Sequence, residues 1–196
     1  MRGLSTFFAA SFFLVAGCQT AMSNQATAIV STRDPETYPL HFKRHNFEAY
    51  CYNTRDCQVI YAGVNQSAYA TGKPASAPPS PDYRKKWPFA SHIGIQNFPE
   101  PARVSWTALS GERLEASIDL GAIFKEELVL HEVPEDDIKE QAFKGPVPSP
   151  SIYLEVNDRT ISIYMKALIP TKHEQIPGDK NSHFRSDVVN AWSKTY

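Results

Sequence analysis

The sequence predicts a mainly β fold, an antiparallel β-sandwich or a barrel-like domain, with long proline-rich loops and room for one short helix near the C-terminus. Several short segments alternate apolar and polar residues or are rich in aromatic and β-branched residues, as strands are. Polar turn residues separate some of these segments. The 15 prolines, which cannot donate to a sheet ladder, gather largely between them and predict loops there.

The first two predicted strands flank a pair of cysteines. Segments 47–52 and 58–62 are rich in aromatic and β-branched residues, and a polar, turn-like stretch separates Cys51 from Cys57. This arrangement predicts a disulfide that closes a hairpin. A pair of metal ligands or a redox pair is the alternative, but the spacing matches neither CxxC nor a zinc pattern.

A long polar loop is predicted next, at residues 65–86. Its stretch Lys73–Pro81 contains four prolines, so it is expected to be a loop or a polyproline segment. A loop of this length inside a compact domain is usually functional or mobile. Trp87, like Trp106 and Trp192, is expected in the core or on a sheet face and not as a sugar-binding platform.

A β-hairpin is predicted in the middle of the chain. Ala102–Ala108 and Arg113–Leu120 both alternate apolar and polar residues, and Ser110–Gly111 forms the turn between them. A short helical turn is expected at Ile123–Phe124, and another strand at Leu128–Val133.

The last part of the chain predicts two strands between two loops. Loop 134–150 precedes strands Ser151–Val156 and Thr160–Ala167, which a tight turn at 157–159 joins. In the second strand, isoleucines and a methionine alternate with Ser, Tyr and Lys. A third loop is predicted at 170–182. The segment Phe184–Trp192 predicts the short C-terminal helix.

The first residues are typical of an exported protein. Arg2 precedes an uncharged run, Phe7–Ala16, that is too short to cross a hydrocarbon core as a helix. Val15-Ala16-Gly17-Cys18 resembles the bacterial lipobox, which implies a signal peptide over residues 1–17 and lipid attachment at Cys18. An ordinary signal peptide with a cysteine near its cleavage zone is the alternative.

The expected organisation follows from that start. Residues 18–40 are polar and predict a lipidated cysteine with a flexible tether, and residues 41–196 predict a single β-rich globular domain. Lipoproteins of this type with Asp after the cysteine tend to stay at the inner membrane. Here Gln19 stands in that place, which favours the outer membrane, facing the periplasm, in a Gram-negative host.

The sequence offers no recognisable catalytic centre. It contains no GxSxG, P-loop, GxGxxG or HExxH motif, and its net charge of −1 argues against nucleic-acid binding. His41 and His45 are the only histidines at a ligand-like spacing, but surface or structural histidines explain them better than a metal site. Residues 135–137 could supply acid–base carboxylates, although a solvated acidic loop is favoured. We therefore expect a binding protein without catalytic residues, cofactor or metal.

The second half of the chain is similar to a known family. Residues 102–196 resemble certain periplasmic lipoproteins that are encoded beside type VI secretion phospholipase effectors. The resemblance is carried by Arg103–Trp106 with Ser110–Gly111, Ile118–Gly121 with Ile123–Phe124, Leu154–Met165, and Ile176–Gly178 with Phe184–Asp187.

The resemblance implies a periplasmic immunity protein that binds and neutralises a cognate secreted lipase, either by covering its active-site entrance or by stopping it from docking on lipid. Loops 65–86, 134–150 and 170–182 are the expected contact surfaces, and no individual contact residue can be assigned. An envelope structural or assembly lipoprotein that binds other envelope or secretion-apparatus proteins is the main alternative. A periplasmic hydrolase on a β scaffold is a weaker one.

Overall fold

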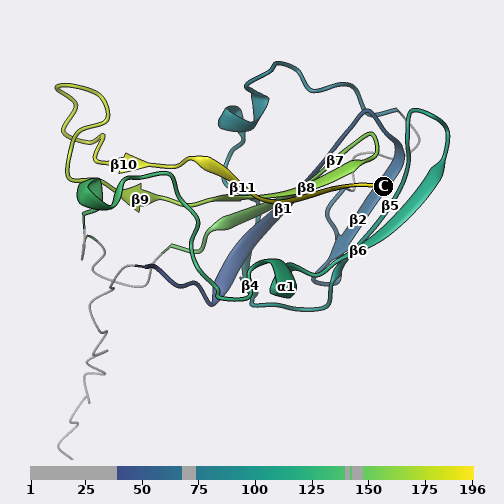
Figure 1. Cartoon of the computed structure of the whole chain (residues 1–196), viewed down its shortest axis with the longest axis horizontal. Coiled ribbons are helices and arrows are strands. Elements are labelled where there is room, and N and C mark those ends of the chain that lie inside the picture. The colour runs from purple at the N-terminus through teal and green to yellow at the C-terminus, as the bar shows by residue number, and fades with distance from the viewer. Residues whose placement is uncertain (1–38, 68–73, 140–141, 143–147) are drawn as a thin grey trace, which may run out of the picture. The chain divides into compact units, whose positions relative to one another are not determined.

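A computed structural model describes residues 39–67, 74–139, 142 and 148–196, and two main sheets dominate them (Figure 1). The five-stranded sheet has the spatial order β11 (Val188–Thr195), β8 (Thr160–Lys166), β7 (Ser151–Asn157), β1 (Arg44–Tyr52) and β4 (His92–Gln96). The four-stranded sheet has the order β3 (Val64–Asn65), β2 (Arg55–Tyr61), β5 (Ala102–Thr107) and β6 (Arg113–Ile118). The pair β9 (Ile169–Pro170) and β10 (Phe184–Arg185) is separate. The short helical elements are η1 (Tyr83–Lys86), α1 (Leu120–Ile123) and η2 (Glu135–Asp137).

The predicted mainly β fold is confirmed, and the two sheets do not close into a barrel. All neighbouring strands pair antiparallel except β1 and β7, which run parallel from Asn46↔Ser151 to Tyr52↔Asn157. A parallel pair needs a long crossover connection, because the chain must return to the same end of the sheet. Here the chain builds the whole four-stranded sheet between the two strands.

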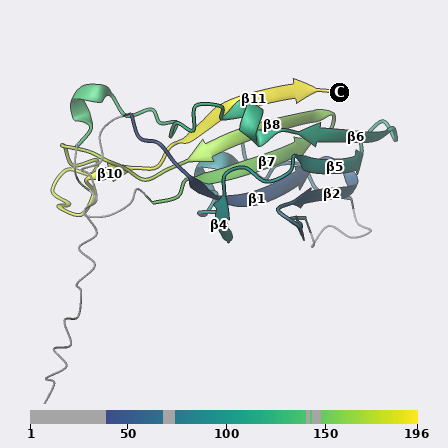
Figure 2. The same ribbon diagram turned by 90° about the horizontal axis from the view of Figure 1, so that it is seen from below.

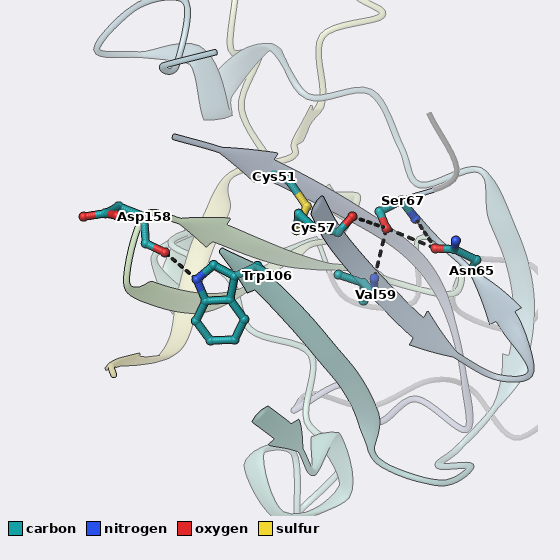
Figure 3. The surroundings of a disulfide bond; sticks show 7 residues. All are labelled: Cys51, Cys57, Val59, Asn65, Ser67, Trp106 and Asp158. Carbon is teal, nitrogen blue, oxygen red and sulfur yellow. Dashed lines mark hydrogen bonds between the residues drawn. A yellow bond between two sulfur atoms is a disulfide. The ribbon is translucent and has the colours of Figure 1, made fainter. Parts of the chain in front are cut away.

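Side chains from both sheets form one buried core. In β5 the alternate residues Ala102, Val104 and Trp106 are buried, as the predicted hairpin requires, and they cluster with the apolar face of β7 and β8. The Trp106 indole N–H also donates to the backbone oxygen of Asp158, 2.6 Å away in the β7–β8 turn (Figure 3). This hydrogen bond fixes the end of the hairpin to the opposite sheet.

The structure contains the predicted disulfide between Cys51 and Cys57, but it does not close a hairpin (Figure 3). β1 and β2 belong to different sheets, so the chain turns a corner at Asn53–Thr54, where Asn53 has a φ of 51°. The polar stretch that predicted a hairpin turn therefore forms a crossing between sheets. The disulfide links β1 of the five-stranded sheet to β2 of the four-stranded sheet.

Replacing both disulfide cysteines with serine should lower the free energy of unfolding by about 2 kcal/mol, because the crosslink restricts a short loop of the unfolded chain. Urea denaturation of the oxidised protein and of the Cys51→Ser/Cys57→Ser variant measures this difference. Adding reductant should move the wild-type midpoint to that of the variant and leave the variant unchanged. Equal midpoints for oxidised wild type and variant would contradict the expectation.

Two predicted elements are wrong. Leu128–Val133 is not a strand: only Leu128 forms a bridge, with His41, although Val129 and Val133 are buried. The apolar pattern there reports packing of an extended segment against the core, not membership of a sheet. The predicted helix at 184–192 is instead β10 and β11, which pair with β9 and β8. The predicted helical turn near Ile123 is present as α1.

His45, one of the two histidines with a ligand-like spacing, is a buried structural residue. Asn97 donates its amide N–H to the Phe42 carbonyl oxygen, which turns its own oxygen toward His45 Nδ1 at 2.8 Å. That oxygen can only accept, so Nδ1 carries the hydrogen and Nε2 accepts from the Tyr61 hydroxyl at 2.9 Å. The ring is thus held neutral, and burial lowers the pKa of His45 below its ordinary value. His41 is exposed and contacts the backbone oxygen of Glu126.

Acid should destabilise the protein through His45. An unfolded histidine has a pKa of about 6.5, and the folded His45 lies below it, so the unfolded state binds more protons as the pH falls through this window. The contribution is therefore complete above about pH 6.5 and is lost progressively below it. Urea unfolding between pH 7.5 and 5 should show a shallower loss of stability for His45→Gln than for wild type. Parallel pH profiles would contradict this.

Candidate functional site

A third layer covers the outer face of the five-stranded sheet. The side of β8 that carries Ser162, Tyr164 and Lys166 is buried, although these residues alternate with apolar ones along the strand. The covering chain is residues 80–91, the end of the first predicted contact loop together with the residues that follow it (Figure 1). Both faces of β7 and β8 are consequently inside the protein.

The contact between this layer and the sheet is mainly aromatic. We call it the outer aromatic cluster, and it consists of Tyr50, Tyr52, Tyr83, Trp87, Ala90, Tyr153, Tyr164 and Val188. Trp87 is its centre: its ring stacks on Tyr50, with centroids 4.8 Å apart, and lies 5.0 Å from the ring of Tyr153. Trp87 is therefore a packed residue on a sheet face, as the sequence predicted.

A buried carboxylate holds η1 on the sheet. Arg84 reaches Glu155 through two hydrogen bonds, Nη2 to Oε1 at 2.6 Å and Nε to Oε2 at 3.1 Å. The Tyr83 hydroxyl donates to Oε2 at 2.5 Å. The Arg84 guanidinium also lies over the rings of Tyr83 and Tyr164. Burial, together with the neighbouring Glu155 carboxylate, raises the pKa of Tyr83, so its hydroxyl stays protonated and remains a donor.

The chain after η1 is attached by three further hydrogen bonds. Lys166 Nζ donates to the Trp87 carbonyl oxygen at 2.5 Å, and burial lowers the pKa of this lysine. The Tyr153 hydroxyl donates to the Pro88 carbonyl oxygen, and the Ala90 N–H donates to Ser151 Oγ. The end of the first predicted contact loop is thus part of the folded body, so residues 83–86 present only one side to solvent.

The third predicted contact loop is strongly ordered by its own hydrogen bonds. It connects β9 to β10, and we call residues 171–183 the β9–β10 loop. Ser182 is its internal anchor: its Oγ accepts from the Ile176 N–H at 3.0 Å and donates to the Asp179 carbonyl oxygen at 2.7 Å. The backbone also closes, with Gln175 N–H to the Ser182 oxygen and Asp179 N–H to the Ile176 oxygen. Gly178 allows the turn with a φ of 84°.

The start of the second predicted loop anchors the β9–β10 loop from outside. Asp137, in η2, accepts from His173 through both the ring Nδ1, at 2.7 Å, and the backbone N–H, at 3.1 Å. The hydrogen bond from His173 lowers the pKa of Asp137. Lys172 contacts the backbone oxygens of Asp136 and Asp137. Asp137 therefore positions a neighbouring loop, a role that neither the acid–base nor the solvated interpretation included.

One charged hollow of about 530 Å³ is lined by the end of the first predicted contact loop and by residues outside the other two loops. Glu132 precedes the second predicted loop, and residues 185–188 follow the third. The lining residues are Pro81, Asp82, Arg84, Lys85, Glu132, Arg185, Ser186, Asp187 and Val188. Positive and negative side chains alternate, and Arg185 Nη2 lies 2.8 Å from Asp187 Oδ2. The fold thus brings residues 81–85, Glu132 and residues 185–188, which are far apart in the sequence, to one hollow.

Two further hollows of similar volume lie elsewhere among the described residues. One, also about 530 Å³, lies between β1 residues 48–52 and residues 74–79, beside the disulfide. The other is a depression of about 450 Å³ on the outer face of the four-stranded sheet, around Ser105. Neither brings ionisable groups together in a catalytic arrangement among the residues that line it.

Large apolar side chains are exposed at a few places in the described structure. Ile176 and Phe184, on and beside the β9–β10 loop, are 60% and 47% exposed. Leu109, in the β5–β6 turn, is 61% exposed. The remaining members are Val64, Phe89 and Ile93. The β9–β10 loop thus combines a fixed backbone with the exposed side chain of Ile176, and Phe184 follows it in β10.

Cys18, the predicted lipid-attachment residue, lies outside the described residues. Within the described ranges, no group of three or more His, Cys, Asp or Glu side chains could hold a metal ion. No helix in that part of the chain is long and apolar enough to span a membrane. Comparison with family models, with curated proteins and with solved structures finds no match to this chain.

Proposed function

We propose that this protein is a periplasmic immunity lipoprotein that binds a cognate type VI secretion phospholipase effector and neutralises it by stoichiometric occlusion. The observation that carries the proposal is the β9–β10 loop, which is closed by its own hydrogen bonds and fastened to η2. A loop that is ordered before binding loses less conformational entropy when a partner covers it. Rigid scaffolds with shaped loops are a common basis for specific recognition.

Three further features support the envelope location and the partner class. The disulfide suits an oxidising compartment. The lipobox-like sequence ending at Cys18 would place the protein on a membrane, where a phospholipase acts. Each buried acyl CH₂ contributes about 0.8 kcal/mol, so two or three chains give a durable anchor. The resemblance of residues 102–196 to lipoproteins encoded beside lipase effectors supports the effector class.

Occlusion needs no chemistry from the immunity protein itself. An interface of standard size buries roughly 1,600 Å² in total, enough to cover the mouth of an active site. The inhibitor is not consumed and turns over no substrate, so inhibition should reach completion at one equivalent. This stoichiometry separates the proposal from a hydrolase that competes for the same lipid.

The test uses the lipase that is encoded beside this lipoprotein. A fixed amount of the lipase is titrated with the full-length lipoprotein in detergent. The tagged lipase should retain the lipoprotein on affinity resin, and phospholipid hydrolysis should fall linearly and stop near a 1:1 ratio. Full lipase activity at a large excess of lipoprotein would sink the proposal. An envelope structural or assembly role would then be the better interpretation.

A further inference from the structure

We propose that the β9–β10 loop is the segment that enters the lipase, with Ile176 and Phe184 filling the apolar cleft that admits acyl chains. This inference rests on the proposed function and deepens it, because it selects one of three predicted contact loops and assigns the mode of inhibition. It concerns the active-site entrance of the lipase and not its surface for lipid docking.

The backbone around Ile176 is fixed on both sides. Its N–H donates to Ser182 Oγ, and its carbonyl oxygen accepts from the Asp179 N–H, both at 3.0 Å. Exposure of this aliphatic side chain does not stabilise the isolated protein, because burying apolar surface is favourable. An apolar side chain on a backbone that is already ordered costs less entropy to bury in an interface, because part of its order is established before the partner arrives.

The surroundings of Ile176 match the anatomy of an interface. Charged and polar side chains of the β9–β10 loop surround the tip and are exposed, with charges of both signs: Lys172, His173, Asp179, Lys180 and Asn181. An apolar centre inside a polar rim is the common arrangement in protein–protein contacts. Since the rim has no dominant charge, apolar fit and not electrostatic attraction would supply the affinity.

The partner surface follows from the chemistry of the lipase. An enzyme that cleaves long-chain phospholipids must present a concave apolar site to the acyl chains. The loop projects from β9 and β10, at the end of the sheets away from the β5–β6 hairpin in both views (Figure 1 and Figure 2). A projecting loop that carries Ile176 and is followed by the exposed Phe184 of β10 is complementary to such a cleft.

Leu109 provides a matched control. It is as exposed as Ile176, but it lies in the β5–β6 turn, where its N–H binds Asp158 in the β7–β8 turn. The β7–β8 turn precedes β8 and β9 follows it, so Leu109 and the β9–β10 loop are associated with opposite ends of that strand. The same substitution at each position separates a specific contact from a general effect of adding charge.

The experiment compares Ile176→Asp, Ile176→Leu and Leu109→Asp with wild type in full-length lipoprotein. Ile176→Asp should weaken lipase binding by about 30-fold or more, the threshold of a hot-spot residue. Ile176→Leu should bind nearly as wild type, and Leu109→Asp should bind within about 2-fold of it. Unfolding midpoints of all variants should agree, because both sites are exposed.

A short-chain soluble ester tests the mode of inhibition. The wild-type complex should hydrolyse neither this ester nor phospholipid vesicles, because the cleft itself is filled. If the wild type inhibits the lipase and Ile176→Asp binds it equally well, the inference is overturned and the proposed function stands. The same holds if the wild-type complex still cleaves the soluble ester. A wild-type protein that neither binds nor inhibits the lipase would instead refute the proposed function.

Discussion

Replacing Trp87 with alanine is expected to lower the free energy of unfolding by about 3–5 kcal/mol, the cost of removing a large aromatic residue from a packed site. Trp87 is 5% exposed and contacts the rings of Tyr50 and Tyr153 at the centre of the outer aromatic cluster. Its removal would leave a cavity between the covering segment and the sheet. It would also loosen the backbone oxygen that accepts from Lys166.

Chemical denaturation of wild type and Trp87→Ala measures this loss. Phe89→Ala is the matched control, because Phe89 lies in the same segment but is 49% exposed. Its ring lies 5.1 Å from the Lys166 ammonium, so about 1 kcal/mol or less is expected. A Trp87→Ala variant as stable as Phe89→Ala would show that the covering layer adds nothing to the stability of the fold.

Replacing Glu155 with alanine is the second large effect, with an expected loss of about 3 kcal/mol, near the lower limit for breaking a buried ion pair. The substitution removes the acceptor of two Arg84 hydrogen bonds and of the Tyr83 hydroxyl. The lower limit applies because the Arg84 side chain is a third exposed and water can replace part of the lost contact.

The exposed pair of Glu112 and Arg159 supplies the comparison. Both side chains reach solvent, so Glu112→Ala should cost less than about 1 kcal/mol. Replacing both partners with leucine, in Glu155→Leu/Arg84→Leu, should recover part of the lost free energy of unfolding. Neither member of the ion pair is then left buried without its partner. If Glu155→Ala and Glu112→Ala reduce stability equally, the Arg84 contact is not a determinant of the outer layer.

Trp87→Ala and Glu155→Ala also test whether the outer aromatic cluster and the β9–β10 loop are independent of each other. Arg84 lines the charged hollow and is held by Glu155, while the β9–β10 loop is held by η2. The hydrogen bonds that order the loop are therefore separate from those that order η1. Destabilisation of the outer aromatic cluster and loss of lipase binding are expected to be separable properties of the protein.

Secondary structure was predictable where it depends on neighbouring residues. The alternation in Ala102–Thr107 and Arg113–Ile118 reflects one buried and one open sheet face, so a period of two identified both strands and their turn. The helix predicted at 184–192 was wrong, because nothing in the sequence indicates that β8 pairs with a strand from this segment. Pairing with a buried strand outweighed the weak helical pattern there.

The candidate site was predictable only as a set of loops. Prolines and polar residues marked 65–86, 134–150 and 170–182 as segments outside the sheets. The end of the first loop folds onto β7 and β8. The sequence of β8 did not indicate this contact, because Ser162, Tyr164 and Lys166 look like an ordinary solvated face. The link between Asp137 and His173 joins residues 36 apart and has no local signal.

The sequence by itself therefore determined the mainly β class, the β5–β6 and β7–β8 hairpins and the pairing of Cys51 with Cys57, because each depends on patterns within a short stretch of chain. The tertiary structure alone decided that β1 and β7 run parallel, that the disulfide spans a corner between sheets, and which side chains stay exposed. These features depend on which distant segments meet. Local periodicity records whether a residue is apolar, but burial depends on what the rest of the chain places over it.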